Sequence, residues 1–152
     1  MEQTNLSRFK HKYRVRVRYF EVDSQAVVHN ARYLEYCEAA RVEYIRDLGR
    51  KVLPGAVDDN IKVMIKKNEI IYHYPARLDD LIDVYTRASY IKNSSLGFEQ
   101  VLVNHETGLS LCTLNAVHVY LDPVTGEPVH IPDNCREMFK EFEGKDLQII
   151  ES

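Results

Sequence analysis

Hydrophobic and polar residues alternate along several short runs of this chain, and one longer run follows a helical period. Between residues 13 and 20, apolar side chains occupy the odd positions and three arginines the even ones. This alternation predicts a half-buried strand. The arginines fit a solvated face that discourages edge pairing, and they also fit a phosphate-binding role; they are Arg14, Arg16 and Arg18.

Apolar residues recur at three- and four-residue spacing from Tyr33 to Leu48, which predicts one long amphipathic helix. Gly49 follows directly and precedes two cations, so we expect the helix to end there in a left-handed cap. One residue breaks the stripe, because Arg41 lies on its apolar side. A buried guanidinium needs a partner, and Glu38 is the nearest candidate in the sequence; the alternative is contact with a bound ligand or a neighbouring subunit.

The remainder of the chain alternates between strands and turns. Residues 50–60 read as a loop, and 61–75 read as two strands or one strongly bent strand, because the apolar positions switch from odd to even near Lys66–Glu69. Further strands are expected at 82–90 and 96–102. A central strand at 109–121 and a short helix at 132–142 follow, whereas residues 1–11 read as a flexible arm.

The order of these elements predicts an α+β fold in a single domain spanning 1–152. A single long helix cannot cover both faces of an antiparallel sheet. Apolar surface would then be left uncovered, so we expect a homodimer or a homotetramer.

Composition narrows the class of protein. A net charge of −3 gives no indication of a nucleic-acid partner, and no apolar run approaches the ~20 residues of a membrane span. The first residues lack the pattern of a signal peptide, so we expect a cytoplasmic protein. Three cysteines without a C-x-x-C pair suit reduced thiols, and the histidine spacing predicts no metal site.

The segment with the most chemical content joins the first strand to the long helix. Asp23 lies in a short loop that also holds His29 and Asn30. A carboxylate placed beside the unpaired N–H groups of a helix start can serve as nucleophile or general base, while those N–H groups stabilise a developing oxyanion. An aspartate in this position is more commonly a cap or turn residue.

The same residues resemble a known family. The pattern Asp-x-x-Gly-hydrophobic-Val-x-(His/Tyr/Asn)-x-x-Tyr before a helix marks the hotdog-fold acyl-CoA thioesterases of the 4-hydroxybenzoyl-CoA thioesterase and YbgC type. Here it reads Asp23 to Tyr33, with Ala26 at the usual glycine position. The likeness continues through Tyr36–Arg41, Tyr72–Asp79 and Val119–Pro132.

The resemblance implies an antiparallel sheet of five strands, or six with a broken strand, wrapped around one long helix. It further implies hydrolysis of an acyl-CoA thioester by Asp23, acting as nucleophile or general base. The Asn30 backbone N–H would polarise the carbonyl, although Asn30 could also be the N-cap of the helix. His29 would either orient Asp23 or the attacking water, or contact the facing subunit. Val28 and Tyr33 are the expected substrate-binding residues.

The expected substrate is an acyl-CoA, with an acyl-carrier-protein thioester as an alternative, and no separate cofactor is expected. Candidate cations for the CoA phosphates, each of which also fits a solvated strand face, are Lys62, Lys66, Lys67, Arg87 and Lys92. Two rival functions remain. A hotdog dehydratase would need a motif that this chain lacks, whereas a non-catalytic acyl-thioester-binding or scaffold protein would share the fold.

Overall fold

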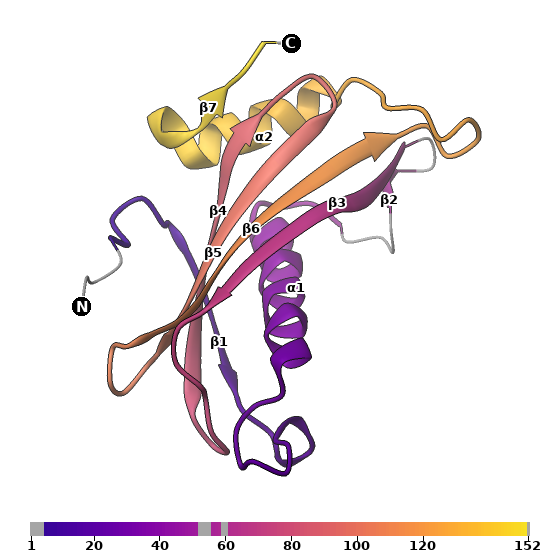
Figure 1. Ribbon diagram of the computed structural model, residues 1–152. Helices are drawn as coiled ribbons and strands as arrows, with labels where there is room; N and C mark the ends of the chain where they lie inside the picture. The colour runs from indigo at the N-terminus through magenta and orange to yellow at the C-terminus, as the bar shows by residue number, and fades with distance from the viewer. Residues whose placement is uncertain (1–4, 52–55, 59–60, 152) are drawn as a thin grey trace. The chain divides into compact units, whose positions relative to one another are not determined.

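The computed structural model describes residues 5–51, 56–58 and 61–151 (Figure 1). Strands alternate with two α-helices and two short 3₁₀ helices. In chain order the elements are β1 (His11–Arg16), η1 (Tyr19–Glu21), α1 (Asn30–Asp47), β2 (Ala56–Asp58), β3 (Ile61–Tyr72), β4 (Leu81–Ile91), β5 (Ser95–Asn104), β6 (Ser110–Leu121), α2 (Asp133–Glu143), η2 (Gly144–Asp146) and β7 (Gln148–Ile149).

The strands form one sheet in the order β1-β4-β5-β6-β3-β2, with β7 paired to β4 outside this path. β4, β5 and β6 are consecutive strands joined by short turns, so neighbours among them run antiparallel. β1 pairs antiparallel with β4, from His11 opposite Thr86 to Arg16 opposite Leu81. The α+β architecture with an antiparallel sheet and one long helix is confirmed.

The chain divides into two compact units. The first contains residues 1–44, 70–86 and 100–114, and the second contains 45–69, 87–99 and 115–152. The candidate site lies wholly within the first unit.

In the first unit, α1 buries a stripe of side chains that follows the predicted helical period. Tyr33, Cys37, Ala40 and Tyr44 are all buried, as predicted, and Tyr36 joins them. A buried amide connects the helix to the sheet, because Gln100 on β5 donates to the Cys37 carbonyl oxygen (2.9 Å) and to the Thr86 hydroxyl (2.9 Å). These bonds satisfy polar groups that burial would otherwise penalise.

The predicted partner of Arg41 is wrong. The guanidinium is buried, and its Nη1 donates to Gln100 Oε1 at 2.8 Å, whereas Glu38 is exposed. Burial lowers the pKa of Arg41, and the negative field of neighbouring groups, Glu38 included, opposes that shift. The buried cation therefore reaches across to a neutral amide on β5, 59 positions away in sequence.

The first strand ends earlier than its alternation predicts. β1 stops at Arg16, and the next residues turn into η1, which leaves Tyr19 83% exposed. The three arginines are exposed, as expected, and each contacts an acidic residue or a carbonyl group of this chain. The partners are Asp83 for Arg14, the Asp79 carbonyl for Arg16 and Glu21 for Arg18. Their observed contacts are structural.

Residues 9 and 11 of the predicted arm contact the rest of the first unit. His11 is buried as the first residue of β1, and the Phe9 ring meets the Tyr85 ring edge-on at 6.2 Å. The part of the predicted arm that covers residues 1–4 lies outside the described residues.

The region around β3 partly corrects the sequence prediction. β3 is one continuous strand, and its half-buried residues switch from odd positions, Ile61 and Val63, to the even position Ile70. The predicted loop at 50–60 is interrupted by β2, which pairs with the start of β3. Residues 52–55 and 59–60 of that loop lie outside the described residues.

In the second unit, the charged C-terminal tail is part of the fold. β7 pairs parallel with the end of β4, where Tyr90 lies opposite Gln148. Glu143, the last residue of α2, is fully buried and accepts the Ala88 N–H at 2.8 Å. A strand of two residues, such as β7, is too short to show a hydrophobic period in the sequence.

The free cysteines among the described residues are all buried: Cys37, Cys112 and Cys135. Burial raises the pKa of Cys37 to about 12 and also raises that of Cys112. None of the described helices is long and apolar enough to cross a membrane.

The predicted left-handed cap at Gly49 is confirmed. Gly49 has φ +94°, and its N–H donates to the Arg46 carbonyl at 3.0 Å, while the Arg50 N–H reaches the Ile45 carbonyl at 3.3 Å. These two bonds form a Schellman motif, which satisfies carbonyls that the helix end leaves unpaired.

Replacing Gly49 with valine should destabilise the protein. Space is open around a Cβ atom at this position, so the backbone conformation alone sets the cost, on the order of 1–2 kcal/mol for a β-branched residue. The midpoint of urea unfolding measures it. Gly49→Asn is the matched control, because asparagine tolerates the left-handed region and should retain most of the stability; equal midpoints for wild type and Gly49→Val would contradict this account.

Candidate active site

The loop between η1 and α1 is a closed turn that presents Asp23. Val22 and Val28 form an antiparallel bridge, and the Asp23 N–H donates to the Val27 carbonyl at 2.9 Å. Inside this ring, the Ala26 N–H donates to the Asp23 carbonyl at 3.0 Å. Residues 22–28 are therefore held by their own main chain.

Ala26 adopts a backbone conformation that favours glycine. Its φ is +64°, in the left-handed region, where an L-residue with a Cβ atom costs roughly 1–2 kcal/mol relative to the right-handed one. Glycine at the matching family position avoids this cost. The loop thus has the positive φ for which glycine is suited, even though this chain carries alanine.

Asp23 is half-buried, and its two carboxylate oxygens differ in their contacts. Its Oδ1 accepts the Gln25 N–H at 2.8 Å, which is an Asx turn. No hydrogen bond from the described residues reaches its Oδ2 atom. One carboxylate oxygen therefore holds the turn, and the other is available to a substrate or a water molecule.

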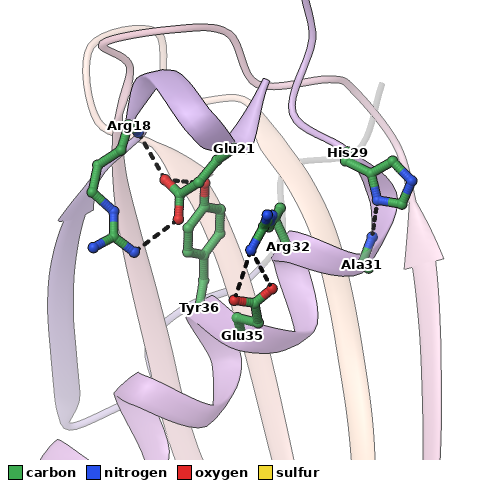
Figure 2. Close-up of polar contacts among 7 residues, drawn as sticks. All are labelled: Arg18, Glu21, His29, Ala31, Arg32, Glu35 and Tyr36. Carbon is green, nitrogen blue, oxygen red and sulfur yellow. Dashed lines mark hydrogen bonds and ion pairs between the residues drawn. The ribbon is translucent and has the colours of Figure 1, made fainter. Parts of the chain in front are cut away.

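His29 is the N-cap of α1. Its Nδ1 accepts the Ala31 N–H at 3.2 Å, as Figure 2 shows. Its carbonyl accepts the Arg32 N–H at 2.9 Å. An accepting Nδ1 carries no proton, so the neutral ring holds its proton on Nε2. The side chain is exposed, which leaves Nε2 facing outward from the helix start.

The structure thereby corrects one alternative for Asn30. Asn30 is the first helical residue and not the N-cap. Its N–H belongs to the first turn, whose donors have no partner inside the helix, and its carbonyl accepts the Tyr72 hydroxyl at 3.1 Å. A partial positive charge at this helix end favours an anion or a developing oxyanion.

Val28 and Tyr33 fix the loop to the segment after β3. The Val28 N–H donates to the Ala76 carbonyl at 2.8 Å, and the Ala76 N–H donates to the Tyr33 hydroxyl at 2.9 Å. Both side chains are buried, and burial raises the pKa of Tyr33. Tyr33 therefore acts as a neutral anchor, while its proposed contact with substrate stays a prediction.

Sequence reasoning missed Glu21, a buried carboxylate two residues before Asp23. Its carboxylate accepts the Arg18 N–H (2.7 Å), Arg18 Nη2 (3.0 Å) and the Tyr36 hydroxyl (3.0 Å), as Figure 2 shows. Tyr36 lies three residues after Tyr33 on the buried stripe, and Glu21 lies two residues before Asp23. Those spacings were the available signal.

The candidate cations differ in environment. Lys62, Lys66 and Lys67 are exposed on β3, and Lys92 lies over the Tyr90 ring at 5.6 Å. Arg87 is buried and contacts Glu99 at 3.3 Å, so the solvated reading is wrong for this residue. No group of three His, Cys, Asp or Glu side chains within the described ranges could hold a metal ion.

Sequence comparisons place this loop and helix in a known family. The model of the thioesterase-like superfamily matches residues 15–139. A protein of Haemophilus influenzae named acyl-CoA thioesterase YbgC is 34% identical over 125 residues, covering 82% of this chain and 90% of that protein. A YbgC protein of Escherichia coli O6:H1, named an acyl-CoA thioester hydrolase, is 31% identical over 84% of this chain and 93% of its own length.

Solved structures of thioesterases share the fold of this chain. A thioesterase from Thermus thermophilus, described as complexed with coenzyme A and Zn, superposes with a TM-score of 0.79 at 28% identity, covering 91% of this chain and 98% of that one. A 1,4-dihydroxy-2-naphthoyl-CoA thioesterase from Synechocystis shares the fold, with a TM-score of 0.81 at 14% identity over 88% of this chain and 97% of its own. The fold is the predicted hotdog fold, and the chain belongs to the thioesterase-like superfamily.

Proposed function

We propose that this protein hydrolyses acyl-CoA thioesters to a free acid and coenzyme A, with Asp23 as the reactive carboxylate. Coenzyme A enters as part of the substrate, so the reaction needs no separate cofactor. The proposal is supported by the family and by relatives named acyl-CoA thioesterases. A panel of short, long and aromatic acyl-CoA esters, with acyl-carrier-protein thioesters alongside, would identify the substrate class.

The observation that carries the proposal is the placement of Asp23. Its loop runs directly into the first turn of α1, and one of its carboxylate oxygens is left open by the Asx turn. A thioester carbonyl between that oxygen and the Asn30 N–H would meet a nucleophile or base on one side and a donor on the other. One such donor is typically worth roughly 3 kcal/mol in the transition state.

Two routes use these groups. As a nucleophile, Asp23 attacks the carbonyl carbon, the C–S bond breaks, the thiolate leaves, and water hydrolyses the resulting anhydride. As a general base, Asp23 takes a proton from water, the hydroxide attacks the carbonyl, and the proton passes to the departing thiolate. In the second route His29, whose exposed side chain lies at the helix start, would orient the water.

A second candidate function is favoured by one specific contact. The bond from Gln25 N–H to Asp23 Oδ1 is what a purely structural turn residue would make. A non-catalytic acyl-thioester-binding protein would keep this bond and lack turnover. The two functions separate on the fate of the substrate, because only the enzyme releases a free thiol.

Replacing Asp23 with asparagine tests the catalytic assignment. Asparagine retains an Oδ1 acceptor for the Gln25 N–H, so the turn should persist while charge and basicity are lost. We expect kcat to fall by at least ~100-fold, with the melting temperature and CoA binding little changed.

The matched control is Asp122→Asn. Asp122 holds a comparable turn in the second unit through the Val124 and Thr125 N–H groups, at 2.8 and 2.9 Å. This variant should keep wild-type turnover. If Asp23→Asn turns over the best substrate within a few-fold of wild type, the mechanism is wrong.

Replacing Ala26 with glycine should preserve or raise activity and raise stability. Glycine removes the cost of a Cβ atom at φ +64°, a gain on the order of 1 kcal/mol that is offset in part by the more flexible unfolded chain. Urea unfolding and steady-state kinetics measure both effects. Ala39→Gly, on the exposed face of α1, is the control and should lose about 1 kcal/mol; a large loss of turnover in Ala26→Gly would mean that the alanine itself is required.

We further propose that the protein works as a homodimer or homotetramer. Large apolar side chains are exposed along β3: Met64, Ile65, Ile71 and Tyr72. The register with β2 covers only the first two residues of β3, so within the described residues the later part of this edge is open. An open apolar edge is a template for pairing with a second sheet.

Sedimentation of the wild type at micromolar concentration should show a dimer or larger assembly. Ile71→Lys places a charge on the open edge and should shift the population towards monomer. Val124→Lys, at a turn residue that is 91% exposed, is the control and should leave the assembly unchanged. A wild type that sediments only as a folded monomer would contradict the proposal.

A further inference from the structure

The contacts of Glu21 link the two ends of the catalytic loop to α1. Its main-chain carbonyl accepts the His29 N–H at 3.0 Å, which brings the residue before Val22 to the residue before Asn30. Its side chain accepts the Tyr36 hydroxyl of α1 at 3.0 Å. Asp23 therefore lies in a loop whose entry and exit are both held by one residue.

The Glu21 carboxylate is held in place by burial and by hydrogen bonds. It is 1% exposed, and it receives three hydrogen bonds, two from Arg18 and one from Tyr36. Burial by itself raises the pKa of a carboxyl group, but these bonds outweigh it and the pKa of Glu21 is lowered. A buried carboxylate that keeps its charge holds its donors more strongly than a neutral group would.

Within the described part of the chain, neither Arg18 nor Tyr36 makes a hydrogen bond to Asp23. Arg18 projects from the start of η1, where its guanidinium lies 4.7 Å from the Phe20 ring centroid, and Tyr36 meets the Tyr33 ring edge-on at 6.1 Å. A group that does not contact Asp23 can affect it only through the geometry of the loop that holds it.

We propose that Glu21, held between Arg18 and Tyr36, is a positioning residue that sets the orientation of Asp23 relative to the first turn of α1. This inference rests on the proposed function, because it assigns Glu21 a role in the reaction of Asp23. Small displacements of a reacting group can cost up to about 100-fold in rate, so a loop that is folded but loosely held should be a poor catalyst.

Two variants weaken the hydrogen bonds between Glu21 and its donors without leaving a large cavity in the core. Tyr36→Phe removes only the hydroxyl that donates to Glu21, and Glu21→Gln keeps the shape but presents an amide N–H₂ group to donors. Each should lower kcat by roughly 10- to 100-fold, with a smaller change in KM, since binding of the CoA moiety does not depend on the orientation of Asp23.

Matched controls remove similar groups elsewhere. Glu35→Gln breaks an exposed ion pair with Arg32 on the same helix (2.9 Å), and Tyr120→Phe removes a buried hydroxyl from β6. Both should keep wild-type kcat once activity is corrected for the folded fraction.

The deciding experiment is a double-mutant cycle between Tyr36→Phe and Asp23→Asn. If Tyr36 and Glu21 act by orienting Asp23, Tyr36→Phe should lower kcat in the wild-type background and have no further effect on the residual rate of Asp23→Asn. A merely structural role would lower activity by the same factor in both backgrounds, and that result would overturn the inference.

The cycle also separates this inference from the proposed function. If Asp23→Asn abolishes turnover while Tyr36→Phe and Glu21→Gln are both as active as wild type, Asp23 is catalytic and the positioning role is wrong. If Asp23→Asn stays active, the proposed mechanism fails, and with it the basis for the positioning role.

Discussion

A main-chain hydrogen bond from the His29 N–H to the Glu21 carbonyl oxygen, 3.0 Å long, closes the loop on which the candidate site depends. It brings the end of η1 against the residue that caps α1. The loop between them then has to reverse within a few residues, which requires the Asx turn at Asp23 and the positive φ of Ala26. Asp23 therefore lies in a closed loop that leads directly into the first turn of α1.

The periodic elements could be predicted because burial imposes a period on the sequence. α1 shows this well: its apolar stripe follows from packing one face, and Gly49 marks its end. β1 shows the limit. Its alternation continues to Tyr19, but Glu21 accepts the Arg18 N–H and turns the chain before that residue can join the sheet. A hydrogen bond within a turn can end a strand even where the alternation of apolar and polar residues continues.

Contacts between distant residues lay beyond the sequence for a different reason. Arg41 required a partner, and the nearest acidic residue was the reasonable expectation, yet the partner is Gln100 on another strand. The two residues of β7 likewise pair with β4 only because α2 and η2 bring them there. Such pairings depend on the three-dimensional path of the chain, which no local pattern records.

The place of the loop and of the helix start was predicted, because a strand, an acidic residue and a helix follow one another within a short span. The catalytic role of Asp23 came from the family resemblance and stays a prediction. Asn30 was considered as a possible N-cap, whereas the structure gives this role to His29, whose Nδ1 accepts the Ala31 N–H. Glu21 was missed because its partner on the helix, Tyr36, lies 15 positions away in the sequence.

The buried cysteines have a practical consequence for measuring this enzyme. Thioester hydrolysis is followed most simply with a reagent that reacts with the released thiol, and such reagents attack only thiolates that they can reach. Cys37, Cys112 and Cys135 are at most 1% exposed, and burial keeps the first two protonated at neutral pH. The cysteines of the folded protein therefore do not react with the reagent, so the signal measures the released thiol alone. Unfolding exposes three thiols per chain, and the same reagent then counts molecules that have lost their structure.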